Sequence, residues 1–166
     1  MNERVPAGHG RREDRRLQER EHDPYASRTK LAEPSVCGRC GAVYHAGRWS
    51  WHPRPNAAEE VICPACRRIS DDYPAGTLVF SGGFLRKHRE EIESTIRRAA
   101  DSETREHPMN RLIDLRWHRG QLTGRTTDVH TPRRIGQAVQ HAFQGDLSLD
   151  YAPAETFVRV GWHRDG

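Results

Sequence analysis

Two short cysteine motifs constrain this chain more than any other feature of its sequence. Cys37 and Cys40 form one C-x-x-C pair, and Cys63 and Cys66 form a second pair after 22 intervening residues. Two residues between cysteines allow a tight turn that points both thiolates at one ion, and tetrahedral zinc takes four such ligands. We therefore predict that all four cysteines bind one structural zinc ion.

Other uses of these cysteines agree less well with the sequence. Cysteines in a reducing compartment stay as thiols, and a thioredoxin-like redox site needs a single C-x-x-C on a βαβ unit. Nucleobase deaminases carry H-x-E before P-C-x-x-C, whereas the H-x-E at His88 follows the cysteines here. His45 and His52 lie between the two pairs, and we expect them to be exposed rather than ligands. A closed four-thiolate site leaves no position for water, which argues against zinc catalysis.

The composition predicts that part of the chain does not pack. Hydrophobic residues make up 34% of the 166 residues and charged residues 30%. Residues 1–33 hold acids and cations in near balance with almost no apolar residues, which predicts a disordered charged arm. No apolar run approaches the ~20 residues that span a bilayer, and residues 1–10 lack the apolar region of a secretory signal. We expect a cytoplasmic protein with no membrane partner.

The rest of the chain divides into two predicted units. Residues 34–80 hold all four cysteines and are too few for a hydrophobic core of their own, which predicts a zinc ribbon stabilised by its metal. Residues 81–166 carry the periodic apolar positions of a second unit. The predicted fold class is α+β, a small zinc ribbon followed by an α-β-β-α-β-β two-layer domain.

The spacing of apolar residues gives the elements of the second unit. Arg119-Gly120 is a turn signal between two strands of a hairpin. Thr131-Pro132 resembles an N-cap followed by proline at the first helical position, and Gly145 ends that helix. In chain order we expect a helix over 85–99, strands over 113–117 and 121–127, a helix over 132–144, and strands over 147–151 and 158–162.

Arginine supplies almost all of the positive charge. The formal net charge is +4, and among the 27 cationic residues only Lys30 and Lys87 are lysines. The planar guanidinium suits phosphate and base edges because it donates two parallel hydrogen bonds. A GC-rich genome would give the same bias, so the composition alone does not predict nucleic-acid binding.

The positions of two arginine pairs are more informative. Arg67 and Arg68 directly follow the last cysteine, and Arg133 and Arg134 fall in the first turn of the second helix, near His130. Backbone N–H groups at a helix N-terminus favour phosphate, and arginine there is unfavourable without an anion. Surface ion pairs with nearby acids are the alternative explanation for Arg133 and Arg134.

Aromatic residues lie among basic ones within the ribbon. Trp49 and Trp51 lie in one short stretch with Arg48 and His52. Such residues stack on unpaired bases in some proteins and form the small core of a ribbon in others. We expect one tryptophan to be structural and take Trp49 as the candidate for base stacking.

The sequence contains no Walker loop, G-x-S-x-G elbow or H-E-x-x-H helix. An enzymatic site around Asp128 and His130 is the weakest of the hypotheses, because no nucleophile with an identifiable base accompanies them. Asp128 is expected to end a strand and to help start the following helix. We therefore expect a non-enzymatic protein.

Five stretches of the chain carry a family resemblance: Cys37-Gly-Arg-Cys-Gly-Ala-Val-Tyr, Gly47-Arg-Trp, Cys63-Pro-Ala-Cys-Arg-Arg-Ile, Asp72-Tyr-Pro-Ala-Gly and Thr126-Thr-Asp-Val-His-Thr-Pro-Arg-Arg-Ile-Gly-Gln-Ala. They resemble an uncharacterised bacterial zinc-ribbon family, and the resemblance covers residues 37–162. That family is similar to the N-terminal zinc region of the archaeal and eukaryotic large-ribosomal-subunit export adaptor, the protein named after nonsense-mediated decay. The adaptor binds ribosomal subunits, so the resemblance implies an RNA or ribosome partner, although a bacterium has no nuclear export.

Together these observations predict a non-enzymatic, zinc-stabilised RNA- or ribosome-binding protein. The alternative is a zinc-ribbon protein–protein adaptor in a stress response. Binding to nucleic acid weakens steeply as salt rises, which separates the two. The predicted nucleic-acid-binding residues are Trp49, Arg67, Arg68, His130, Arg133 and Arg134.

Overall fold

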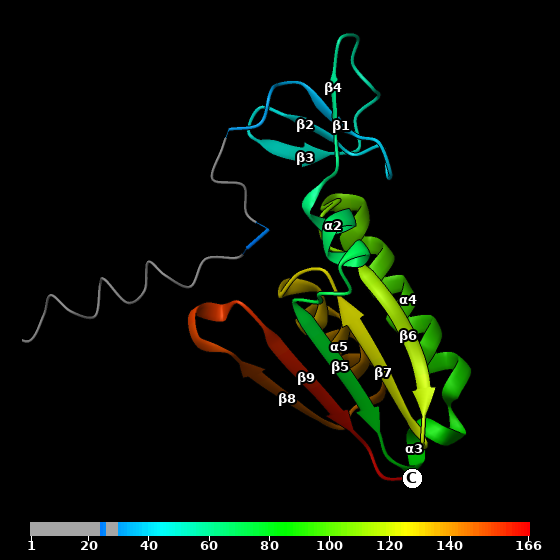
Figure 1. Ribbon diagram of the computed structural model, residues 1–166. Coiled ribbons are helices and arrows are strands. Elements are labelled where there is room, and N and C mark those ends of the chain that lie inside the picture. Colours follow the sequence, from blue (N-terminus) through cyan, green and yellow to red (C-terminus); the bar gives the residue numbers. More distant parts are fainter. Residues whose placement is uncertain (1–23, 26–29) are drawn as a thin grey trace, which may run out of the picture.

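The computed structural model describes residues 24–25 and 30–166 of the chain. The predicted arm over 1–33 therefore lies outside the described residues, except at 24–25 and 30–33. The described chain forms a small β-sheet that carries the cysteines and a larger β-sheet that is covered by helices (Figure 1). This arrangement confirms the predicted α+β class.

The small sheet has the strand order β3-β2-β1-β4 and is followed by a short helix, α2. β1 pairs antiparallel with β2 and parallel with β4. Because β1 ends at Cys37 and β4 ends at Val61, the parallel pairing places both cysteine pairs at the same end of the sheet. The bounds are β1 (Ser35–Cys37), β2 (Val43–His45), β3 (Arg48–Ser50), β4 (Glu59–Val61) and α2 (Pro64–Ser70).

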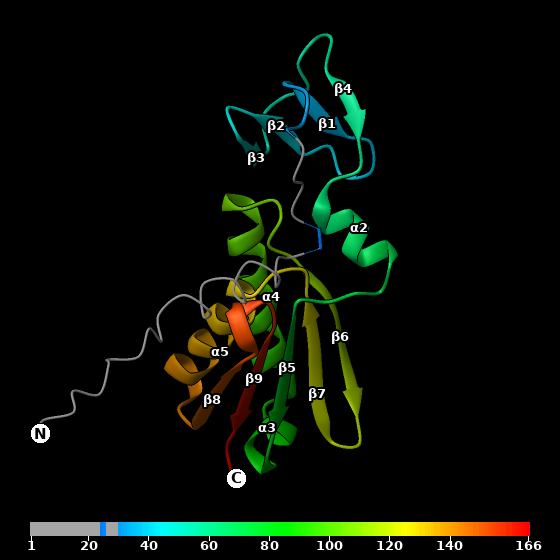
Figure 2. The same ribbon diagram turned by 60° about the vertical axis from the view of Figure 1, so that its left-hand side comes forward.

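The large sheet has the strand order β6-β7-β5-β9-β8, in which the pair β5 and β9 is parallel and the other neighbours are antiparallel. The helices α4 and α5 cover one face of this sheet and leave the other face open (Figures 1 and 2). The bounds are β5 (Gly76–Ser81), α3 (Gly83–Lys87), α4 (Arg89–Glu106), β6 (Leu112–His118), β7 (Gln121–Thr126), α5 (His130–Phe143), β8 (Asp146–Tyr151), the 3-10 turn η1 (Pro153–Glu155) and β9 (Val158–His163).

Three details differ from the elements that the sequence predicts. The central strand β5 is not among the predicted elements, and it lies mostly within residues 34–80, which the prediction assigns to the ribbon. The helix predicted over 85–99 is two helices that meet at His88, whose φ of −119° and ψ of 33° interrupt the helical backbone. The helix α5 begins at His130 rather than at Pro132, because the Asp128 carboxylate accepts hydrogen bonds from the N–H groups of His130 and Thr131 at 2.9 Å.

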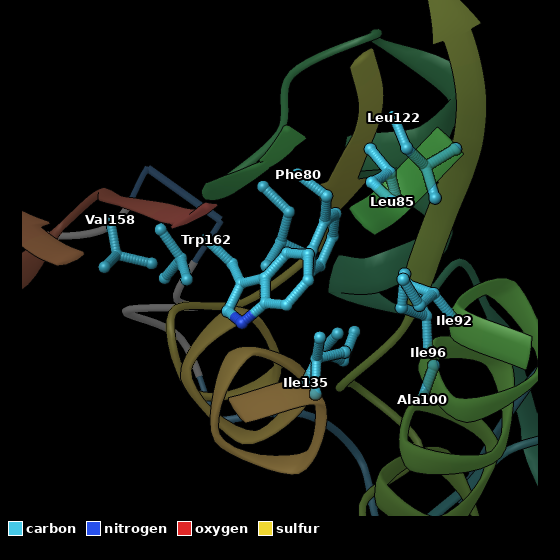
Figure 3. Packing of buried hydrophobic residues seen from close by; sticks show 12 residues of the cluster. Phe80, Leu85, Ile92, Ile96, Ala100, Leu122, Ile135, Val158 and Trp162 are labelled. Carbon is cyan, nitrogen blue, oxygen red and sulfur yellow. The ribbon is translucent and has the colours of Figure 1, made fainter. Parts of the chain in front are cut away.

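The core lies between the helices and the large sheet. Phe80 of β5 and Trp162 of β9 are fully buried, with their ring centroids 6.3 Å apart, and Ile135 of α5 packs beneath them (Figure 3).

The helix α5 lies very close to the sheet. A Cβ at Gly136 would be 2.8 Å from a side-chain carbon of Leu147 on β8 and 2.8 Å from one of Val160 on β9. Full burial of each large apolar side chain stabilises the fold by about 1.5–3 kcal/mol. The helices are therefore held in place by the sheet on which they pack.

Within the described residues, no helix combines the length and the apolar character that crossing a bilayer requires.

Candidate functional site

The four cysteines converge at the base of the small sheet. Their sulfur atoms all lie within 4.8 Å of one another, and the Sγ atoms of Cys40 and Cys63 are 3.8 Å apart. A tetrahedron with Zn–S bonds of ~2.3 Å has edges of about 3.8 Å, so this spacing fits one zinc ion. The cysteines form no disulfides, and three of them are buried while Cys40 is partly exposed. The predicted zinc ligands are thus brought together as one structural site.

The local backbone explains how each pair presents its thiols. The first pair follows β1, where the Gly41 N–H donates to the Cys37 carbonyl at 2.9 Å and closes the knuckle turn. In the second pair, Cys63 caps α2 and its sulfur accepts from the Cys66 N–H at 3.4 Å. The N-terminal end of α2 favours negative charge, so the second pair is placed where thiolates are stabilised.

Burial and hydrogen bonding act in opposite directions on the metal-free thiols. Burial raises the pKa of the Cys63 and Cys66 thiols. Burial also opposes ionisation of Cys37, but backbone hydrogen bonds outweigh it and lower its pKa to about 6. Zinc binds thiolates, so metal binding has to displace protons from the two thiols whose pKa is raised.

One residue of this site was not found from the sequence. Arg111 precedes β6, and its guanidinium donates to the sulfur of Cys40 at 2.9 Å and to that of Cys66 at 3.4 Å. Burial opposes the charge on Arg111, but these hydrogen bonds raise its pKa. In the sequence it is only one of many arginines, 45 residues beyond Cys66, so no local pattern could have indicated it.

Removal of the metal tests how far the two sheets depend on each other. Chelation should loosen the small sheet and leave most of the helical circular-dichroism signal, because the large buried cluster consists of residues between Leu78 and Trp162. Circular dichroism before and after chelation measures this directly. Loss of the entire helical signal would show that the large sheet cannot fold without zinc.

A second site lies beside the N-terminal end of α5. This open pocket of about 680 Å³ is formed by the end of α4, the segment after it and the first turns of α5. Three of the predicted binding residues, His130, Arg133 and Arg134, line it together. All of its described lining residues are polar, and they are Glu103, His107, Asn110, His130, Arg133, Arg134 and Gln137.

The pocket has an excess of positive charge. Arg134 Nε lies 3.9 Å from a carboxylate oxygen of Glu103, while Arg133 is exposed and has no ion-pair partner in the described part of the chain. The backbone N–H groups that we expected to attract an anion are not free, since Asp128 occupies those of His130 and Thr131. Attraction of an anion therefore depends on the side chains rather than on the helix end.

The other predicted binding residues lie elsewhere. Arg68 is only 4% exposed, donates to the Tyr73 carbonyl at 3.1 Å, and lines a smaller pocket of about 410 Å³ that shares His130 with the first. Arg67 is exposed on α2 and lines neither pocket. Trp49 packs against the cysteine cluster, whereas Trp51 is 42% exposed. Roles of Arg67, Arg68 and Trp49 in binding stay predictions.

A further polar cluster lies at the end of the parallel strands. Ser81 Oγ is 2.9 Å from Nδ1 of His163, whose Nε2 is 3.0 Å from a carboxylate oxygen of Asp165. The Asp165 side chain is 94% exposed, so water screens its effect on the imidazole, and we assign the cluster no catalytic role.

No family model, curated protein or solved structure matches this chain significantly, so its function has to be inferred from the geometry of these sites.

Proposed function

We propose that the protein binds RNA, free or within the ribosome, and that the pocket beside α5 receives a backbone phosphate. One observation carries the proposal: Arg133 and Arg134 share an open polar pocket with His107 and His130, and Glu103 is the only acid among its described lining residues. The two guanidinium groups and the single carboxylate leave an excess of one positive charge among these residues. A phosphate diester fits this balance of charge.

The open, polar pocket also favours a nucleic-acid backbone over a small carboxylate-bearing metabolite. Guanidinium groups donate paired hydrogen bonds to phosphate oxygens, and phosphate contacts make up much of protein–nucleic acid recognition. The pocket is wide, and its described residues offer no apolar wall to enclose a small molecule. In this proposal zinc has a structural role, because the four-cysteine site leaves no open coordination position. No enzymatic step is part of it.

The experiment measures RNA affinity at two salt concentrations for the wild type and for the double variant Arg133→Ala/Arg134→Ala. Anisotropy of a labelled single-stranded RNA of mixed sequence is a suitable readout. We expect the double variant to lose about 1.5–3 kcal/mol of binding free energy for each charge-assisted hydrogen bond to phosphate that it removes, and to do so for every RNA sequence alike. The slope of log affinity against log salt concentration should become shallower by about 0.7 for each phosphate of the single strand that the variant no longer binds.

A matched control separates this pocket from general electrostatics. Arg97→Ala/Arg98→Ala removes the same charge from an exposed part of α4 that lines neither pocket. The control should bind RNA nearly as well as the wild type. Equal losses in both double variants would remove the pocket from the mechanism. Absence of RNA binding at any salt would remove the proposal itself and leave the protein–protein adaptor as the hypothesis to pursue.

A further inference from the structure

The hydrogen bonds to the four sulfur atoms are divided between two sources. Cys37 and Cys63 each accept from the backbone of the zinc module, by which we mean the small sheet β1–β4 and the helix α2. The Cys37 sulfur accepts from the Cys63 N–H at 3.3 Å, and the Cys63 sulfur accepts from the Cys66 N–H at 3.4 Å. Within the described residues, the nitrogen donors to Cys40 and Cys66 both belong to Arg111. A longer contact of 3.7 Å joins the same guanidinium to Cys63. Arg111 thus faces three of the four metal ligands.

The guanidinium also lacks any other anion among the described residues. Arg111 is half-buried, and no carboxylate within the described chain forms an ion pair with it. Its remaining contacts are the Pro108 carbonyl, which accepts from Nε at 2.7 Å, and the Trp51 ring, whose centroid lies 5.7 Å away. A cation removed from water requires a compensating charge. A zinc ion with four thiolates carries a formal charge of −2, which supplies that charge.

The backbone of Arg111 is fixed to the large sheet rather than to the zinc module. Its N–H donates to Thr127 Oγ1 at 3.0 Å, and its carbonyl accepts from the Thr127 N–H at 2.9 Å. Thr127 directly follows β7, and its hydroxyl in turn donates to the Met109 carbonyl at 2.6 Å. These hydrogen bonds extend the β6–β7 hairpin and fix the backbone position from which the guanidinium reaches the sulfur atoms. Such preorganisation is typical of groups that support metal ligands without touching the metal.

We propose that Arg111 is an outer-sphere partner of the zinc centre, which neutralises part of its charge, orients Cys40 and Cys66, and joins the metal site to the large sheet. It is a positioning residue, because it acts through the sulfur atoms. Loss of such outer-sphere partners usually lowers metal affinity about 10- to 100-fold. Cys40 is the least buried ligand, and the Arg111 guanidinium shields its sulfur from solvent.

The test compares zinc affinity in Arg111→Gln, Arg111→Lys and the wild type, by competition with a chromogenic chelator. We expect Arg111→Gln to bind zinc about 10- to 100-fold more weakly. Arg111→Lys should fall between the two, since it keeps the charge but cannot bond two sulfurs with a planar fork. The thiolate-to-metal absorption bands of both cobalt-substituted Arg111 variants should be shifted relative to those of the cobalt-substituted wild type. Iodoacetamide should modify Cys40 faster in Arg111→Gln than in the wild type.

Arg125→Gln is the matched control for lost stability. Arg125 lies on the same hairpin and bonds the carboxylates of Asp114 and Asp72 rather than a sulfur. This variant should be less stable, with an unchanged zinc affinity and cobalt spectrum. Wild-type zinc affinity in both Arg111 variants would overturn the proposal, as would an equal loss of affinity in Arg125→Gln. Circular dichroism of each loaded protein confirms that folded chains are compared.

Discussion

Cys63→Ser is expected to abolish zinc binding, so that the purified variant contains no zinc while the wild type contains about one ion per chain. Cys63 is fully buried, caps α2 and lies 3.8 Å from the sulfur of Cys40. Serine cannot replace it, because its hydroxyl stays protonated and is a poor ligand for zinc in this site. Elemental analysis of the purified proteins measures the result.

The loss should also destabilise the small sheet severely. Structural zinc sites contribute an apparent ~10–16 kcal/mol in zinc-finger peptides, and the small sheet has few buried apolar side chains with which to offset such a loss. Proteolysis should therefore cut within 34–66 in the variant and spare that segment in the wild type. Ser35→Ala, which leaves the ligands intact, provides a control for substitution in this sheet. Retention of zinc by Cys63→Ser, or iron in the wild type, would contradict the assignment.

Phe80→Ala is expected to lower the free energy of unfolding by about 3–5 kcal/mol. Phe80 is fully buried in the central strand β5 and packs in the core beside Trp162 (Figure 3). Its truncation leaves a cavity that the surrounding sheet and helices cannot fill. Urea denaturation followed by circular dichroism gives the difference.

The adjacent residue provides the control for this substitution. Val79 is on the same strand but points to the open face of the sheet, where it is 38% exposed. Val79→Ala should change the stability much less than Phe80→Ala, because it removes little buried surface. Similar effects of the two substitutions would show that the faces of β5 have been assigned incorrectly.

The predictable part of the fold is the part with local signals. The β6–β7 hairpin, α5 and the last two strands follow from alternation, helical spacing and turn residues close to each element. β5 escapes prediction because its few residues follow the Tyr73-Pro-Ala-Gly turn directly and resemble the end of the ribbon. Its place at the centre of the sheet depends on pairing with β7 and β9, which lie far along the chain.

The metal site illustrates the same limit. The four ligands are predictable because the spacing of each pair defines a turn, and zinc requires four of them. Arg111 is not predictable, since its hydrogen bond to Cys40 spans 71 residues and depends on how the hairpin packs against the zinc module. Likewise, the sequence suggests His130, Arg133 and Arg134 as a group, but only the fold shows that His107 from the segment after α4 joins them.

The position of β9 determines the order in which the two sheets are completed during synthesis. All four zinc ligands lie within residues 37–66, so they are synthesised before Arg111 and before most of the large sheet. β9 is the last strand in chain order, yet it lies between β5 and β8. Until it emerges, β5 has one unpaired edge and β8 has no partner within the described sheet, and pairing over such a separation is slow. A nascent chain therefore carries all four zinc ligands while one edge of β5 is still unpaired, and unpaired strand edges of this kind are prone to aggregation.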